Sequence, residues 1–465
     1  MKNIAIKKIA TAVALSFAVV TATAQDITSY FMTDAVETKF HNAAFAPDRG
    51  YLALPMIGGM TLSTNGNMSL GTMFRSIDGS LVPILDTRVS SADALSGLKD
   101  VNSFGMDSRL NILGFGGYGK SGKSFWSFDL SLRTSMSFAM PYEFFDFMKN
   151  TPDNTSIKDL NIYMDSYAEA AFGYSRPVIF DNLIVGVRVK VLAGLMSASL
   201  NIDKMDFTLS SDIWSAAAQG TLNINASGVA PTASKNDDGE TIYNIDDIEG
   251  TPDGIAGIGA AVDFGATYTM FNDRLKLSAA VNDLGFIKWK RDCNTTATIA
   301  NDFEFSGVDV TVGDDGDVST DDSSTDIAID DIEFVAQESQ DTTKSLQANI
   351  KLGGEYNFFD NRIGLGAVYN TYLYRAKSYH ALTGIATFRP NGWFSVAGSY
   401  SLSNSTGNSL GLALNIAPGV INFYLASDLL MSKKSVQYIP INQSSMSFSF
   451  GLAFSFGKGS RREGI

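Results

Sequence analysis

The last stretch of the chain alternates strictly between bulky apolar residues and small or polar ones. Within residues 445–457 one set of alternate positions holds large apolar side chains, while Ser, Gly and Ala fill the other set. Successive side chains of a strand point to opposite faces, so this segment is a strand with one apolar and one small polar face. It reaches the roughly 9 to 11 residues that a strand needs to cross a bilayer at a tilt. The pattern predicts that the chain ends as a membrane-spanning strand.

The same alternation recurs along most of the chain. We count fourteen such segments, at 68–77, 104–118, 124–138, 162–175, 183–200, 256–271, 274–290, 346–359, 362–375, 379–389, 393–403, 409–417, 420–431 and 444–457. Tight turns such as Asn272-Asp273 and Asp360-Asn361 join some of them, whereas 139–161, 201–255 and 291–345 are long connections. Short turns on one side and long loops on the other are typical of outer-membrane barrels.

This layout predicts an all-β fold, a transmembrane antiparallel β-barrel of about 14 strands with long extracellular loops. An even strand count places both termini in the periplasm. The alternative is a large soluble β-sandwich or propeller, in which the alternating faces would be core and solvent. Aromatic residues near strand ends favour the barrel, because they suit a girdle at the membrane interface. They are Trp126, Trp289, Trp393 and Tyr174.

The first 24 residues have the features of a secretory signal peptide. Lys2, Lys7 and Lys8 precede an apolar run from residue 9 to 20, and Ala22-Thr23-Ala24 matches a signal peptidase site. Together with the strand pattern, this predicts the outer membrane of a Gram-negative bacterium, with outer-membrane lipid as a partner.

Residues 25–66 are too apolar for a free periplasmic tail, so we expect an N-terminal plug in the lumen, followed by the barrel at 67–465. Five residues represent the plug: Phe40, Asn42, Phe45, Pro47 and Tyr51. The alternative is that 51–63 forms one more strand.

Charged residues repeatedly occupy the face opposite the apolar one. We expect them to line the lumen and the pathway, where pairing of opposite charges satisfies them. They are Asp129, Arg133, Glu169, Arg188, Lys190, Asp263, Lys351 and Glu355.

One segment changes phase within 274–290. The apolar face that runs to residue 281 needs a shift of one residue after it, which predicts a β-bulge in the wall at Asn282, Asp283 and Gly285. Such a bulge either opens the wall sideways or lets Trp289 reach the membrane interface.

Acidic residues are concentrated in two stretches. Residues 292–343 contain 15 Asp or Glu and no Lys or Arg, and 235–253 hold seven acids against one lysine. This distribution argues against nucleic acid as a partner and predicts solvated loops, with loose calcium binding as the alternative. With two histidines and one cysteine in the chain, we expect no catalytic site, no metal site and no cofactor.

Three stretches resemble an uncharacterised family of bacterial outer-membrane β-barrels within the long-chain fatty acid transporter (FadL-like) superfamily. They are His41-Asn42-Ala43-Ala44-Phe45-Ala46-Pro47, Asp283-Leu284-Gly285-Phe286-Ile287-Lys288-Trp289 and Phe450-Gly451-Leu452-Ala453-Phe454-Ser455-Phe456-Gly457. The resemblance implies a fourteen-stranded barrel with an N-terminal plug. It also implies transport of hydrophobic compounds, or a partnership with secretion or surface-assembly machines.

The sequence thus predicts a plugged barrel that passes small hydrophobic molecules across the outer membrane. Two alternatives stay open: a non-transporting accessory barrel that docks onto other outer-membrane or surface proteins, and a surface adhesin.

Overall fold

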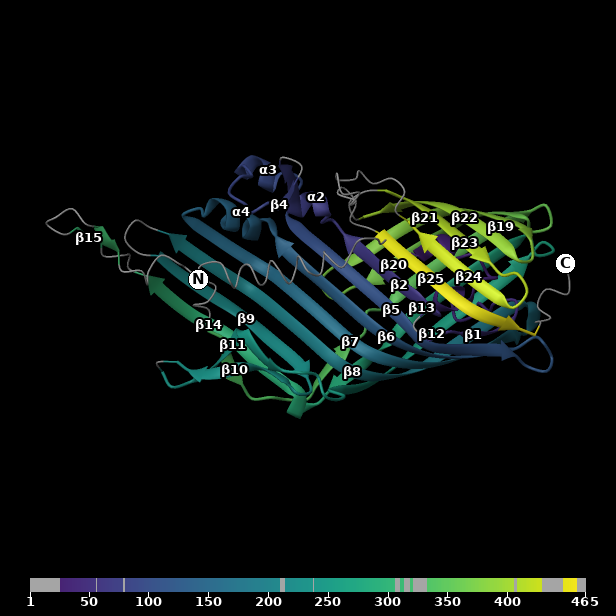
Figure 1. The fold of residues 1–465 in the computed structure, drawn as a ribbon, viewed down its shortest axis with the longest axis horizontal. Coiled ribbons are helices and arrows are strands. Elements are labelled where there is room, and N and C mark those ends of the chain that lie inside the picture. The colour runs from purple at the N-terminus through teal and green to yellow at the C-terminus, as the bar shows by residue number, and fades with distance from the viewer. Residues whose placement is uncertain are drawn as a thin grey trace.

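The strands of the chain close into one antiparallel barrel (Figure 1). The computed structural model describes residues 26–55, 57–77, 80–209, 214–236, 238–305, 310–312, 318–320, 333–404, 408–428 and 446–457. The wall consists of fourteen strands, the first of which is formed by β1 and β2 together, and the last strand pairs with the first. In order they are β1 (Gly50–Ala53) continued by β2 (Met60–Gly66), β5 (Val101–Tyr118), β6 (Phe125–Pro141), β7 (Asn154–Val178), β8 (Phe180–Leu209), β12 (Gly257–Met270), β13 (Leu275–Trp289), β19 (Asn349–Phe358), β20 (Ile363–Leu373), β21 (Ser378–Asn391), β22 (Phe394–Ser403), β23 (Ser409–Ile416), β24 (Ile421–Ser427) and β25 (Met446–Phe456). The predicted fourteen-stranded barrel is confirmed.

The first wall position is not the segment that the alternation predicts. β1 and β2 both lie between β25 and β5, so the wall begins at Gly50 and the expected boundary at residue 66 is wrong. The expected strand at 68–77 forms α2 (Leu70–Met73) and β3 (Phe74–Ile77), which pairs with β4 (Ser80–Pro83) in a sheet separate from the wall. Pro55 and Gly58-Gly59 interrupt the alternation between β1 and β2 and hide the strand from a period-two search. One strand gained and one lost leave the count unchanged.

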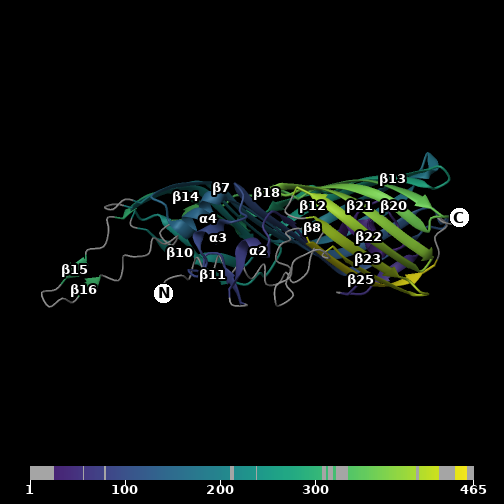
Figure 2. The same ribbon diagram turned by 90° about the horizontal axis from the view of Figure 1, so that it is seen from above.

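Beyond the barrel proper, several strands continue into a sheet at the end far from the C-terminus (Figures 1 and 2). This distal sheet contains the ends of β7 and β8 together with β9 (Trp214–Ala226), β14 (Asn294–Phe305), β17 (Val335–Gln337), β11 (Thr241–Gly250) and β10 (Val229–Lys235). Much of 139–161, 201–255 and 291–345 is therefore strand rather than loop. The remaining elements there are η3 (Arg291–Cys293), β18 (Thr342–Ser345), and the pair β15 (Val310–Val312) and β16 (Val318–Thr320).

The distal sheet has a hydrophobic core of its own. Buried side chains of the sheet, including Ile157, Phe207 and Leu222, pack with the helical insertions α3 (Ser91–Leu95) and α4 (Tyr142–Asn150). Phe147 of α4 stacks on Phe207 with ring centroids 4.0 Å apart. Because burial of apolar surface stabilises structure in water, this end of the molecule is a folded unit rather than a set of solvated loops.

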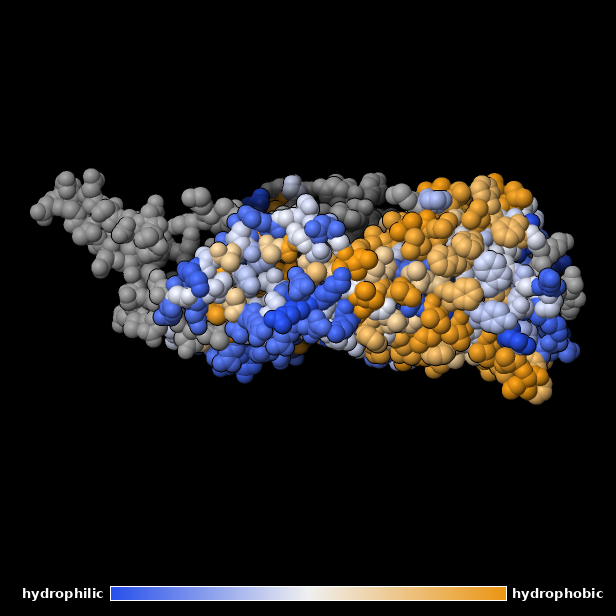
Figure 3. All heavy atoms as spheres, turned by 90° about the horizontal axis from the view of Figure 1, so that it is seen from below, coloured by the Kyte–Doolittle hydropathy of each residue, from blue (hydrophilic) through white to orange (hydrophobic). Residues whose placement is uncertain are grey.

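Apolar side chains gather on the outside of the barrel near the C-terminal end, while the distal half is largely hydrophilic (Figure 3). Exposed members of this apolar belt come from every side of the wall: Leu52, Trp126, Phe172, Val189, Phe264, Leu277, Leu352, Leu365, Leu382, Tyr400, Leu412, Phe423 and Phe454. A band of outward apolar residues is what lipid contact requires of a barrel. Within the described residues, we find no helix long and apolar enough to cross a membrane.

One predicted girdle residue lies elsewhere. Trp126, Tyr174 and Trp393 are exposed, whereas Trp289 is fully buried. It belongs to an apolar cluster with Leu192 and Ile287, and the expectation that it reaches the interface is wrong. Glycines in two neighbouring strands make this possible, because a Cβ at Gly194 would lie 2.7 Å and one at Gly257 3.0 Å from the indole.

Candidate functional site

The residues that precede the wall lie inside the barrel. This lumenal segment, Asp26–Arg49, contains the short helices η1 (Asp26–Ser29) and η2 (Val36–Phe40), and most of its side chains are buried. Its apolar residues, among them Tyr30 and Phe31, pack against small inward residues of the wall such as Ala397 and Ala426. Small wall residues leave the space that the segment fills.

Side-chain hydrogen bonds connect the lumenal segment to several wall strands. The carboxylate of Asp34 accepts hydrogen bonds from Ser395 (2.7 Å) and Asn415 (2.9 Å). Asn42 donates to the carbonyl of Ala279 at 3.1 Å, and the hydroxyls of Tyr30 and Ser278 lie 3.1 Å apart. The segment is thus held by side chains, without joining the strand pairing of the wall.

Two glycines bring the wall backbone close to the lumenal segment. Gly186 of β8 and Gly265 of β12 are directly paired. A Cβ at Gly186 would lie 2.0 Å from the carbonyl oxygen of Ala43, and one at Gly265 would lie 2.0 Å from Oδ1 of Asn42. Any other residue at either position would displace the segment.

Asp129 joins the lumenal segment to the wall through charge. Its Oδ1 lies 3.0 Å from Nζ of Lys39, and its Oδ2 lies 3.2 Å from Arg188. The hydroxyl of Tyr51 in β1 also donates to Asp129 at 3.2 Å. Tyr51 is therefore an inward side chain of the wall and not a part of the plug.

The predicted lumen residues of β6, β7, β8 and β12 form one buried ion-pair network. Lys190 lies 2.7 Å from Asp263 and 3.6 Å from Glu169. Arg133 lies 3.2 Å from Glu169, and Arg188 lies 4.0 Å from Asp263. Pairing of this kind offsets the large cost of removing charges from water.

Two further predicted lumen residues lie apart from this network. Nζ of Lys351 lies 3.1 Å from Nδ1 of His41, whose Nε2 lies 3.1 Å from the hydroxyl of Ser29. A protonated lysine only donates, so Nδ1 accepts and Nε2 carries the hydrogen. Glu355 pairs with Arg389 at 2.7 Å, and Arg389 also donates to the carbonyl of Phe31 at 2.7 Å.

The predicted bulge is present on β13. The register with β12 shifts between Val262 and Phe264, and Asp283 has a φ of 60°. The bulge turns Asp283 inward, where its carboxylate lies 2.5 Å from Lys190 and 3.4 Å from Arg133. Asn282 donates to the carbonyl of His41 at 3.1 Å. Strand pairing continues on both sides, and Gly285 fits closely against Ala260.

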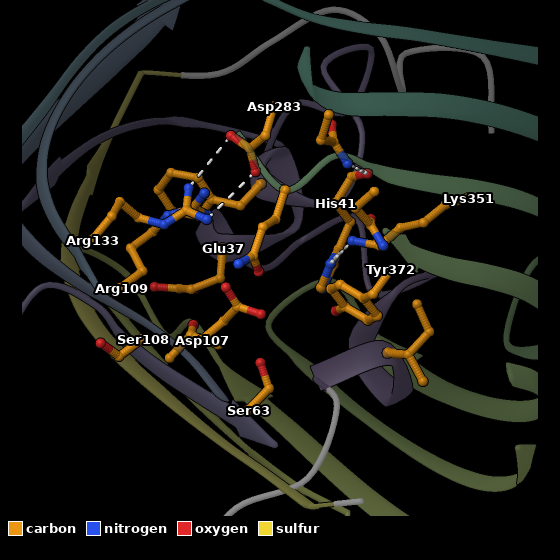
Figure 4. A pocket seen from close by; sticks show the side chains of 16 residues that line it. Glu37, His41, Ser63, Asp107, Ser108, Arg109, Arg133, Asp283, Lys351 and Tyr372 are labelled. Carbon is orange, nitrogen blue, oxygen red and sulfur yellow. Dashed lines mark hydrogen bonds and ion pairs between the residues drawn. The ribbon is translucent and has the colours of Figure 1, made fainter. Parts of the chain in front are cut away.

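The lumenal segment separates two cavities. The smaller one, of about 90 Å³, lies against Phe40 and His41 (Figure 4). The larger one, of about 870 Å³, is lined by Ala44 and Phe45 of the same segment. Pro47 lies nearby, and its carbonyl accepts a hydrogen bond of 2.7 Å from Tyr118. The remaining wall residues of both cavities are mostly polar.

Sequence reasoning missed Lys39, Arg109 and Arg389. Arg109 and Arg389 do lie in segments that were recognised as strands. Alternation along these strands turns both side chains inward, and this could have identified them as lumen residues. Lys39 belongs to an irregular segment, in which no periodicity indicates where its side chain points. Among the described residues, no group of three or more His, Cys, Asp or Glu side chains is placed to hold a metal ion.

Residues 43–428 match a protein family that is described as a family of unknown function, DUF5723. The chain belongs to the DUF5723 family. This match covers most of the chain and confirms that the sequence belongs to an uncharacterised family. No curated protein matches it.

Several solved proteins are similar in structure to this DUF5723 chain. The toluene transporter TodX of P. putida is 10% identical, with 90% of each chain covered and a TM-score of 0.37. The toluene transporter TbuX of Ralstonia pickettii is 11% identical, with 94% of this chain and 96% of that chain covered and a TM-score of 0.41. A Pseudomonas aeruginosa FadL homologue is 9% identical, with 94% of each chain covered and a TM-score of 0.31. Likeness at this level carries no argument about cargo.

Proposed function

We propose that this DUF5723 chain is a gated passage for small molecules across the outer membrane, with the lumenal segment as its gate. The observation that carries the proposal is the position of this segment between two cavities. Phe40 and His41 face one of them, and Ala44 and Phe45 face the other. Displacement of this short stretch would join the cavities into one path.

The nature of the segment's attachment supports a gate. Besides apolar packing, its contacts with the wall are ion pairs and side-chain hydrogen bonds, such as Lys39 with Asp129 and Asn42 with Ala279. Water can replace these polar contacts once the segment shifts, whereas a strand built into the barrel would have to break its ladder to move. The wall can therefore stay closed while the segment shifts.

The lining of the two cavities indicates which solutes could pass. The FadL-like resemblance predicts hydrophobic molecules, but the cavities on both sides of the gate are lined mostly by polar and charged side chains. Burying an apolar solute there would strip water from those groups without replacing its hydrogen bonds. The lumen favours solutes that carry polar groups of their own.

We place the distal sheet outside the cell and both termini in the periplasm. The described strands of the acidic stretches, such as β11 and β14, belong to the distal sheet, and the short turns, such as Asn272-Asp273 between β12 and β13, belong to the other end. Long outer connections and short periplasmic turns are the usual arrangement of such barrels.

A disulfide can test the gate. The hydroxyls of Thr28 in the segment and Ser399 in the wall lie 2.5 Å apart. We expect Thr28→Cys with Ser399→Cys, in a chain that also carries Cys293→Ser, to form a disulfide that fixes the segment. Proteoliposomes with the oxidised protein should swell slowly in a small sugar or amino acid, and a reductant should restore the rate of the Cys293→Ser protein.

The two single-cysteine proteins are the controls, and neither should respond to reductant. Equal swelling before and after reduction, with the disulfide verified by mass spectrometry, would exclude the segment as a gate. No swelling above that of empty liposomes in any form would exclude the passage itself.

An accessory role is the second candidate, and the folded distal sheet favours it. A rigid surface with its own core is better suited to docking a protein partner than mobile loops are. Residues 306–332 can be removed with β14 and β17 left in place, because these strands pair with each other. Loss of a stoichiometric partner from native mass spectra on this deletion, with swelling unchanged, would support the accessory role.

A further inference from the structure

Arg109 occupies an unusual position on the wall. It lies on β5 directly opposite Arg133 of β6, and on its other side it pairs with Thr61 of β2. Two like charges at directly opposed positions of neighbouring strands destabilise a sheet unless other groups compensate them. The compensation is unequal here.

Arg133 has two carboxylates, Glu169 at 3.2 Å and Asp283 at 3.4 Å. Among the described residues, Arg109 has no carboxylate oxygen within the 4.0 Å of an ion pair, and its buried Nε has no hydrogen-bond partner. A buried arginine without a carboxylate partner is stabilised by an anion that binds from solution.

The contact that Arg109 does make leaves its donors available. Its guanidinium carbon lies 4.2 Å from the centre of the Phe40 ring. A cation over an aromatic face is attracted to the ring, but the N–H groups of a guanidinium lie in its plane and point away from that face. The N–H edge of the Arg109 guanidinium therefore stays free to bind a planar group.

That edge belongs to the smaller cavity, shown in Figure 4. Lys351 and His41 approach from the opposite side, and the hydroxyls of Ser63 and Ser108 belong to the same lining. The lining contains three acids, of which Asp283 pairs with Lys190 and Asp107 accepts a hydrogen bond from the hydroxyl of Tyr374, while Glu37 of the lumenal segment is the third. With about 90 Å³ of space, the cavity admits a molecule of only a few non-hydrogen atoms.

We propose that this cavity binds the carboxylate of a small organic acid through Arg109. The two oxygens of a carboxylate match two parallel N–H groups of a guanidinium, and the hydroxyl of Ser63 can donate to the same oxygens. This inference deepens the proposed passage by naming a solute class, and as a step of transport it rests on that proposal. Binding itself can be measured with the gate closed.

Isothermal titration calorimetry on the full-length protein in detergent, in a low-chloride buffer, tests the site. Acetate is the probe, with acetamide as its neutral match and inorganic phosphate as the other oxyanion. We expect saturable binding of acetate, no binding of acetamide, and at least tenfold weaker acetate binding in Arg109→Gln. The acetate affinity of Arg109→Lys should lie between those of the unmodified protein and Arg109→Gln, because lysine keeps the charge and loses the paired N–H groups of the guanidinium.

Arg274→Gln, at an exposed turn, is the matched control and should bind acetate as the unmodified protein does. Heat-dependent gel mobility establishes that each variant is a folded barrel. Equal acetate affinity in Arg109→Gln, or no saturable acetate binding at all, would overturn the proposal. Phosphate that binds more tightly than acetate would overturn the assignment to a carboxylate. Because no passage is measured, a failure here is distinct from a failure of the gate.

Discussion

Nζ of Lys39 lies 3.0 Å from Oδ1 of Asp129, with side chains that are 3% and 0% exposed. This ion pair is the charged link between the lumenal segment and β6, and Arg188 shares the same carboxylate at 3.2 Å. The position of the segment in the lumen therefore depends on a group that also belongs to the network of the wall.

Asp129→Asn should destabilise the barrel markedly. The change leaves Lys39 and Arg188 buried with less compensating charge, and removing one partner of a buried pair typically costs about 3–5 kcal/mol. The shift in the midpoint of heat-dependent gel mobility measures the loss. Asp181→Asn, which breaks the exposed pair of Asp181 with Lys123, should cost no more than about 1 kcal/mol. Similar midpoint shifts for the two variants would show that the buried pairs of Asp129 contribute no more to stability than an exposed ion pair does.

A side chain at Gly186 should displace the lumenal segment without breaking the wall. In Gly186→Val the new Cβ would meet the carbonyl of Ala43 at 2.0 Å. We expect faster cleavage of the segment by protease and higher single-channel conductance in planar bilayers. Gly384→Val is the control, since nothing lies within 4 Å of a Cβ there. Unchanged conductance and cleavage in Gly186→Val would mean that the segment does not block the path.

The conformation of Asp283 should matter as well as its charge. Its φ of 60° is in the left-handed region, which Asn tolerates and a β-branched residue does not. We expect Asp283→Val to lose about 1–2 kcal/mol more stability than Asp283→Asn, which loses only the charge. Thermal unfolding in detergent compares the two. Equal losses would indicate that the bulge relaxes freely.

Tryptophan fluorescence should separate the lipid-facing indoles from the buried one. In proteins that retain a single tryptophan, brominated lipids should quench Trp126 and Trp393, which are 37% and 48% exposed. Trp289 is fully buried and should be protected. Strong quenching of Trp289 would contradict its place in the apolar cluster with Leu192.

Strands with uninterrupted alternation were predicted well, because a period of two is a local property of the chain. The expected segments 104–118 and 409–417 correspond closely to β5 and β23. The prediction failed where the local pattern is broken. Pro55 and Gly58-Gly59 interrupt the first wall strand, which we expected only as an alternative, and an apolar core stabilises strands within 201–255, which we expected to be a long loop.

The inward phase of the charged residues was also predictable, since it follows from alternation. Their partners were not. Asp263 and Lys190 lie on non-consecutive strands, and the 2.7 Å between them depends on the closure of the barrel and the register of β8 with β12.

The sequence by itself determined that the chain forms a membrane barrel and which face of most strands turns inward, because alternation acts through neighbouring residues. Only the tertiary structure decided where the wall begins, where Trp289 lies, and that Arg109 lines a cavity with no ion-pair partner among the described residues. These features depend on contacts between residues far apart in the chain, and such contacts exist only once the barrel has closed around the lumenal segment.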